Sequence, residues 1–141
     1  MQLEIEPYVG IGPIKFGMTI DEVRNFIKDP PKSFLKGPAS TIPTDAFDGL
    51  GLHVFYKKPG VCNAVEMFLP ASPTFQGQRL IKRSFNESLS WLQNMDDAVK
   101  VDQCGATSFK FGIGLYAPEI KEDDSAPIEA VIVFERDYYK K

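Results

Sequence analysis

The sequence has few of the residues on which most enzyme and metal sites depend. Its 141 residues include one histidine, His53, and two cysteines, Cys62 and Cys104. A site that requires two imidazoles is therefore excluded within one chain. The cysteines lie far apart and form no CxxC motif, so we expect two buried or half-buried thiols, with a disulfide as the open alternative. We predict no catalytic residue, no metal site, no cofactor and no enzymatic activity.

The sequence also lacks long apolar runs and an excess of positive charge. No segment approaches the ~20 apolar residues that a membrane-spanning helix needs, and the first residues do not have the pattern of a secretory signal. With 16 basic and 19 acidic residues the formal net charge is −3. That balance argues against nucleic acid and against anionic membranes as partners. We therefore predict a cytoplasmic protein whose partner is basic.

Two segments have the pattern of an amphipathic helix that begins with a capping box. In the first, Thr19 precedes Glu22 by three residues, and apolar positions 20, 23, 26 and 27 form one stripe in a helix that runs to about residue 28. In the second, Ser84 precedes Glu87 by three residues. Its apolar stripe consists of Phe85, Ser88, Leu89, Leu92 and Met95. Each segment therefore predicts a helix that packs one face on a core.

Alternating apolar residues predict strands between and after these helices. Residues 50–56 and 61–69 alternate on either side of the turn at 57–60 and predict a central hairpin. Further strands are expected at 3–5, near 99–101, at 109–115 and at 128–135, and an edge strand is possible within 33–43. Residues 136–141 have the composition of a charged tail.

The two halves of the chain resemble each other in sequence. Thr19 aligns with Ser84, Gly51 with Gly112 and Ala64 with Ala130, at offsets of 65, 61 and 66 residues. We interpret this as an internal duplication with halves of about 1–70 and 71–141. Neither half alone buries its apolar faces well. The sequence therefore predicts a single α+β domain, 1–141, in which one antiparallel sheet carries two helices on one face.

An acidic loop is either a solvated tip between two strands or a binding site for a basic partner. Residues 119–127 link two strands with more residues than a tight hairpin requires, and they contain four acids and one lysine. An exposed acidic loop raises the association rate with a basic partner and helps to set its orientation. The candidate partner-binding residues are Asp45, Asp48, Glu119, Glu122, Asp123 and Asp124.

Residues 10–23 resemble a helix start found in small bacterial proteins. The residues that carry the resemblance are Phe16-Gly17-Met18-Thr19 followed by Glu22-Val23. Similar segments occur in the small lipoprotein of the outer-membrane barrel-assembly machine and in immunity proteins that protect bacteria from contact-delivered toxins. The chain departs from the lipoprotein pattern because it has no signal or lipid-attachment cysteine and carries the unit twice. The resemblance therefore implies an immunity protein.

Two functions follow as expectations. The first is an immunity protein that binds a cognate toxin domain, expected to be a basic nuclease, covers its active site and is a monomer or weak dimer. The alternative is a small-molecule binding module with a pocket on the curved sheet. Its lining would be Phe55, Phe68, Phe111 and Phe134.

Overall fold

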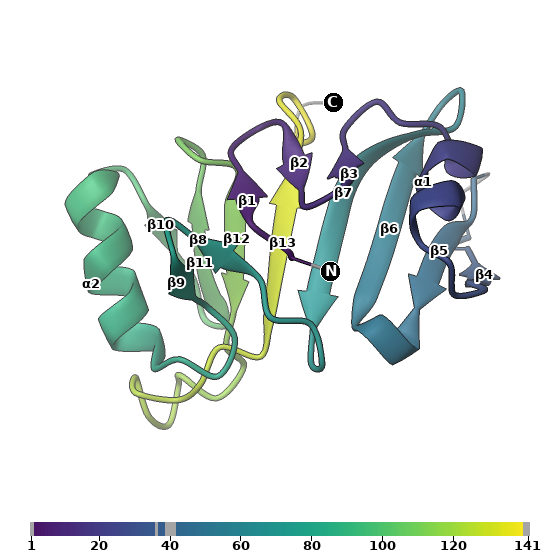
Figure 1. Cartoon of the computed structure of the whole chain (residues 1–141). Coiled ribbons are helices and arrows are strands. Elements are labelled where there is room, and N and C mark those ends of the chain that lie inside the picture. Colours follow the sequence, from purple (N-terminus) through teal and green to yellow (C-terminus); the bar gives the residue numbers. More distant parts are fainter. Residues whose placement is uncertain (1, 36, 39–41, 140–141) are drawn as a thin grey trace.

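An eight-stranded antiparallel sheet forms the centre of the computed structural model, which describes residues 2–35, 37–38 and 42–139 (Figure 1). Its strands, in spatial order, are β10 (Lys100–Val101), β11 (Gly105–Ser108), β12 (Ile113–Tyr116), β13 (Ala130–Phe134), β7 (Val61–Phe68), β6 (Leu52–Lys57), β5 (Thr44–Phe47) and β4 (Lys32–Phe34). The α+β class predicted from the sequence is confirmed, and the predicted hairpin β6–β7 lies near the middle of the sheet.

The sheet has the same strand order on both sides of its midpoint. Four strands lie on the side of β7 and four on the side of β13, and each set follows one helix in the sequence. At the midpoint, Glu66 on β7 pairs with Ile132 on β13. Two residues to either side of this pair, Ala64 pairs with Phe134 and Phe68 pairs with Ala130. In each of these pairs an alanine on one strand lies opposite a phenylalanine on the other, so exchange of the two strands converts one pair into the other. The pairing is therefore nearly two-fold symmetric about Glu66 and Ile132.

The backbone contacts before each helix repeat in the same way. In each half, the backbone N–H of a residue with positive φ donates to the carbonyl oxygen of a residue at, or just before, the start of the last strand of that half. The N–H of that same residue donates in return to the carbonyl oxygen of the residue that follows the one with positive φ. In the first half these bonds are Gly17 N to Cys62 O, 2.8 Å, and Cys62 N to Met18 O, 2.7 Å; in the second they are Lys82 N to Ile128 O, 2.8 Å, and Ile128 N to Arg83 O, 2.9 Å. Each helix is thus tied to the sheet by equivalent bonds.

Helix α1 (Ile20–Phe26) begins with the predicted capping box. Thr19 Oγ1 accepts from Glu22 N at 3.2 Å, and Glu22 Oε1 accepts from Thr19 N at 3.0 Å. Val23 and Ile27 are buried, but Phe26, which we expected in the apolar stripe, is 56% exposed. Successive helical residues are rotated by about 100°, so burial of Val23 and Ile27 leaves Phe26 at the border of the buried face.

Helix α2 (Phe85–Met95) buries the predicted stripe through Phe85, Ser88 and Leu92. The second capping box, however, is absent, because the Ser84 hydroxyl contacts the Asn86 side chain instead of a backbone N–H. The carbonyl oxygens of Asp124 and Ala126 accept from Asn86 N and Phe85 N, at 3.0 and 2.9 Å. The loop before β13 therefore caps this helix, which a local sequence pattern could not predict.

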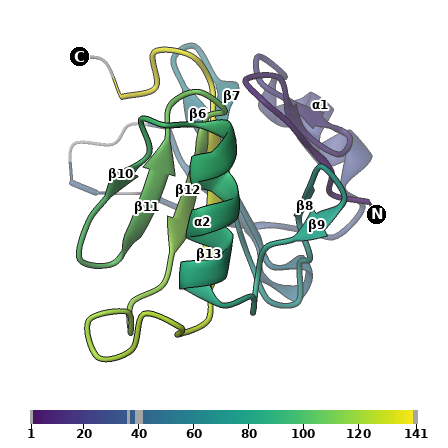
Figure 2. The ribbon, with the colours of Figure 1, turned by 90° about the vertical axis from the view of Figure 1, so that its left-hand side faces the viewer.

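Both helices lie on one face of the large sheet, as predicted (Figures 1 and 2). Two small sheets cover the same face between them. One is three-stranded and consists of β1 (Ile5–Glu6), β2 (Gly10–Ile11) and β3 (Ile14–Lys15); the other pairs β8 (Thr74–Phe75) with β9 (Gln78–Arg79). Strands β2 and β3 lie in the glycine-rich segment that precedes α1. The main core lies between these elements and the large sheet.

One predicted strand is wrong. Residues 109–115 alternate in sequence, but the chain turns at 109–112, where Gly112 has a φ of 68°, and the strands β11 and β12 lie on either side. Phe109 and Phe111 are therefore turn residues. Between β5 and β6 a short 3-10 helix, η1 (Asp48–Leu50), replaces the start of the expected strand. Part of the possible edge strand at 33–43 lies outside the described residues, and β4 forms that edge.

Candidate functional site

The face of the large sheet opposite the helices is left open by the described secondary-structure elements (Figure 2). Side chains from the centre of the sheet point to this face at alternate positions. Phe34, His53 and Phe68 lie together in the first half, with ring centroids 5.5 and 4.8 Å from His53. Tyr116, 48% exposed, lies on β12 in the second half. An antiparallel sheet can leave one face to solvent, but large aromatic side chains there are typical of a binding surface.

His53 is held between two carboxylates on this open face. Its Nε2 atom lies 3.2 Å from Asp48 Oδ1, and its Nδ1 atom lies 3.7 Å from Glu66 Oε1. The rings of Phe34 and Phe68 pack edge-on against the imidazole. These neighbours include no hydroxyl or thiol that the imidazole could activate, so the arrangement is suited to contact with a partner.

Asp45 is buried and forms part of an internal polar cluster. Arg24 donates to both of its carboxylate oxygens, at 2.9 and 2.7 Å, and Tyr56 Oη and Ser33 Oγ donate at 2.9 and 3.2 Å. Burial alone would raise the pKa of Asp45, but the hydrogen bonds from Arg24 and Tyr56 outweigh it and lower the pKa. Burial and the bond to Asp45 raise the pKa of Tyr56. The carboxylate is satisfied internally, so we do not include Asp45 in a contact surface.

The other five predicted site residues follow or precede strand ends on the same edge of the sheet, but Asp48 lies on one half of the sheet and the four acids of the loop on the other (Figure 1). Asp48 is in η1, and Glu119, Glu122, Asp123 and Asp124 are in the loop between β12 and β13; both connections are at the lower edge in Figure 1. All five are exposed. Asp45 lies apart from them, on the core side of β5.

The acidic loop at 119–124 is held in one conformation by hydrogen bonds. Asp123 Oδ1 accepts from Ser125 N and Ser125 Oγ, at 2.9 and 2.6 Å, and these bonds lower the pKa of Asp123. Asn86 Nδ2 donates to Asp124 Oδ1 at 3.4 Å, in addition to the backbone bonds that cap α2. Within the described part of the chain, no salt bridge joins the four acids of this loop to a cation. The loop therefore presents uncompensated negative charge on an ordered backbone.

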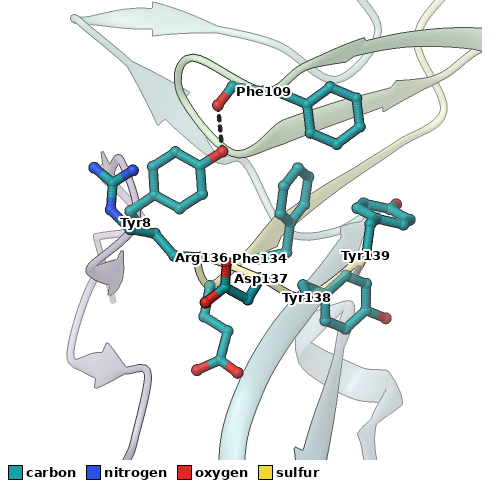
Figure 3. Close-up of a pocket in the computed structure, with 8 residues that line it drawn as sticks. Tyr8, Phe109, Phe134, Arg136, Asp137, Tyr138 and Tyr139 are labelled. Carbon is teal, nitrogen blue, oxygen red and sulfur yellow. Dashed lines mark hydrogen bonds between the residues drawn. The ribbon is translucent and has the colours of Figure 1, made fainter. Parts of the chain in front are cut away.

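An aromatic cavity of about 290 Å3 lies at the other end of the sheet (Figure 3). Tyr8, Phe109 and Phe134 line it, together with the segment 135–139 that follows β13. The ring of Phe134 contacts those of Tyr8, Phe109, Tyr138 and Tyr139, with centroids 5.0 to 6.1 Å away. The hydroxyl of Tyr8 donates to the carbonyl oxygen of Phe109, which joins the first loop of the chain to the β11–β12 turn (Figure 3).

Most of this cavity could not be predicted from the sequence. Residues 136–139 were interpreted as a charged tail, although the spacing of Phe134, Tyr138 and Tyr139 is a signal that aromatic side chains gather there. Nothing in the sequence near Tyr8 indicates its contact with residues about a hundred positions later. Of the four phenylalanines expected in a pocket, only Phe134 lines the cavity. Phe55 packs beside it, Phe68 contacts His53, and Phe111 packs on Phe75 on the helix side.

Comparisons with protein-family models, with curated proteins and with solved structures found no match to this chain. The described residues contain no group of three or more His, Cys, Asp or Glu side chains placed to hold a metal ion. None of the helices in the described part of the chain is long and apolar enough to cross a membrane. Both cysteines are free thiols; Cys62 is buried, whereas Cys104 is exposed and not buried or half-buried as expected.

Proposed function

We propose that the protein is an immunity protein that binds a basic toxin domain, a nuclease, and covers its active site without catalysing a reaction. The observation that carries the proposal is the acidic loop at 119–124. Its four acids are exposed and form no ion pair within the described residues, whereas Asp48, also exposed, lies beside His53 on the other half of the sheet. A basic partner would supply the missing counter-charges.

The order of the acidic loop supports tight binding. Because backbone bonds to Phe85 and Asn86 and the Asp123–Ser125 turn already fix the loop, little conformational freedom remains to be lost on association. Exposed charges of this kind raise the association rate and set the orientation of the two proteins. Salt screens these charges over a Debye length of about 8 Å at physiological ionic strength.

The open face of the sheet supplies the apolar part of the proposed interface. Phe34 and Tyr116 are 41% and 48% exposed, and Phe68 lies beside His53. Aromatic side chains contribute much of the binding energy at interfaces when they are buried at their centre. In this account the acids at the edge orient the toxin and the aromatic residues of the open face bury against it.

The same architecture supports the proposal that the chain arose by internal duplication, with halves of about 1–70 and 71–141. The mirrored strand order, the exchange-related register of β7 and β13, and the paired bonds before each helix are what two copies of one unit would retain. The copies differ at the connection between the last two strands: the first has the short turn at 57–60, whereas the second has the long acidic loop. That difference is where a new binding specificity is expected.

Protection of cells tests the proposed function directly. The toxin domain encoded beside this chain is expressed in a susceptible host with and without this protein. The proposal predicts growth arrest by the toxin alone and restored growth on co-expression, together with a stoichiometric complex that can be purified. If a demonstrably toxic neighbour is not neutralised and forms no complex, the immunity function is wrong.

A second candidate function is small-molecule binding, because the aromatic cavity has the size of a small ligand site. It is compatible with toxin binding, since the acidic loop lies at the lower edge of the sheet in Figure 1, whereas the segment 135–139 that lines the cavity follows the upper end of β13.

A further inference from the structure

One cation lines the aromatic cavity, and a second cation lies close to one of its rings. The guanidinium carbon of Arg136 lies 4.3 Å from the ring centroid of Tyr8, and Lys100 Nζ lies 5.6 Å from the ring centroid of Phe109. Within the described residues neither cation forms a salt bridge. Arg136 lines the cavity and is available to a ligand, whereas Lys100 lies beside the ring of Phe109 and is not one of the lining residues.

One of the two carboxylates that line the cavity is already paired with a cation outside it. Glu135, which lines the cavity, is paired with Lys57 at 2.5 Å and is mostly shielded from solvent. Asp137 is the second acid of the lining. The residues that line the cavity include one cation, Arg136, and two acids, Glu135 and Asp137, and Lys57 compensates the charge of Glu135. Arg136 is exposed and forms no salt bridge within the described residues, so it is the group that would hold an anionic guest.

The walls favour a flat guest. Phe109 and Tyr139 are 43% and 54% exposed, and their rings stand nearly perpendicular, with centroids 5.7 Å apart. A volume of about 290 Å3 is near the lower limit of ligand pockets, which suits a single or fused ring and not a dinucleotide. Aromatic walls with a guanidinium beside them bind planar rings by stacking and anions by charge-assisted hydrogen bonds.

We propose that this cavity binds a small aromatic anion, in which a planar ring packs against Phe109 and Tyr139 and a carboxylate or phosphate reaches Arg136. The inference deepens the second candidate function by naming its ligand class, and it does not depend on toxin binding. The exposed charge of Arg136 provides the selectivity, and the rings provide the contact area.

Isothermal titration of the full chain with probes that share one ring tests this inference. The probes are indole-3-acetate, an anion; tryptamine, a cation; and 3-methylindole, which is neutral. Adenosine 5′-monophosphate distinguishes a phosphate from a carboxylate as the anionic group. We expect at least one of the two anions to bind more tightly than tryptamine and 3-methylindole.

Two substitutions and a control locate the binding. Arg136→Gln should weaken the preferred anion by about tenfold or more, because it removes a charged hydrogen-bond donor. Tyr139→Ala should weaken all ring-bearing probes that bind, and Lys121→Gln, an exposed lysine of the acidic loop, should change nothing. Tryptamine binding as tightly as the anions would overturn the ligand class but leave small-molecule binding. Unchanged affinity in the Arg136 variant, or no binding of either anion at millimolar concentration, would overturn the site.

Discussion

The carbonyl oxygen of Gly51 accepts a hydrogen bond from the backbone N–H of Phe68 at 2.9 Å. An equivalent bond joins Gly112 to Phe134 at 3.1 Å. Both glycines have positive φ, 72° and 68°. Gly51 immediately precedes β6, and Gly112 immediately precedes β12. The first bond holds the end of β7 against the turn before β6, and the second holds the end of β13 against the turn before β12. Because β7 and β13 are antiparallel, Phe68 and Phe134 lie at opposite ends of the open face.

The two glycines should differ in their tolerance of a side chain. A Cβ atom at Gly51 would lie 1.9 Å from Phe68 O, whereas one at Gly112 would lie 3.0 Å from Phe134 O. The left-handed conformation alone costs an alanine about 1–2 kcal/mol. We expect Gly51→Ala to lower the free energy of unfolding by more than about 2 kcal/mol, and Gly112→Ala by less than Gly51→Ala.

Urea denaturation measures both losses. Gly49→Ala is the control, because nothing lies within 4 Å of its added Cβ and its φ is not positive; it should be nearly neutral. An equal cost for the alanine variants of Gly49 and Gly51 would contradict the close approach at Gly51.

The polar cluster at Asp45 should contribute to stability in a pH-dependent way. Asp45→Asn leaves Arg24 without its carboxylate, so we expect a loss of about 2–3 kcal/mol, at the low end for a buried pair because Arg24 is partly exposed. The native pKa of Asp45 is below its ordinary value, so this stability is present above the unfolded pKa of about 3.9. It is lost as the pH falls through the lower folded pKa.

Unfolding free energies of the wild type and Asp45→Asn, measured from pH 7 to pH 2, test this sign. The difference between them should be constant above about pH 5 and shrink below pH 4. Asp48→Asn, at an exposed carboxylate, is the control and should have little effect on stability. A difference that grew on acidification would contradict the assignment.

The two thiols should differ strongly in reactivity. Burial raises the pKa of Cys62 to about 12, and Cys62 is fully buried, whereas Cys104 is exposed. The thiolate is the reactive form. We expect one thiol per chain to react with a disulfide reagent in the native protein and two in urea. Mass mapping should find the native label on Cys104, and Cys104→Ser should abolish it; labelling of native Cys62 would contradict the burial.

Local patterns predicted the parts of the fold that depend on local contacts. The capping box at Thr19 and Glu22, the hairpin β6–β7 and the buried stripe of α2 follow from periodicity and turn chemistry. The cap of α2 and the pairing of Asp45 with Arg24 depend on residues 21 to 41 positions apart, and sequence periodicity carries no signal for them. The same distinction holds for the candidate sites. The composition of residues 119–127 predicts the acidic loop, whereas the cavity depends on a contact between Tyr8 and Phe109, which lie far apart in the sequence.

The most direct test of the proposed function is the affinity of the purified protein for its cognate toxin domain, measured in two charge-reversal variants. Glu119→Lys/Glu122→Lys changes two loop acids whose side chains form no hydrogen bond within the described residues. Asp29→Lys/Asp97→Lys changes two exposed acids outside that loop. Each double variant shifts the net charge from −3 to −3 + 4 = +1, so the two differ only in where the charge is placed.

The account predicts that the loop variant loses at least about tenfold in affinity at low salt, equivalent to ~1.4 kcal/mol. Its affinity should also depend less on salt than that of the wild type, and the Asp29/Asp97 variant should stay close to the wild type. Equal affinities and equal salt dependence in the wild type and the loop variant would contradict the acidic loop as the contact surface.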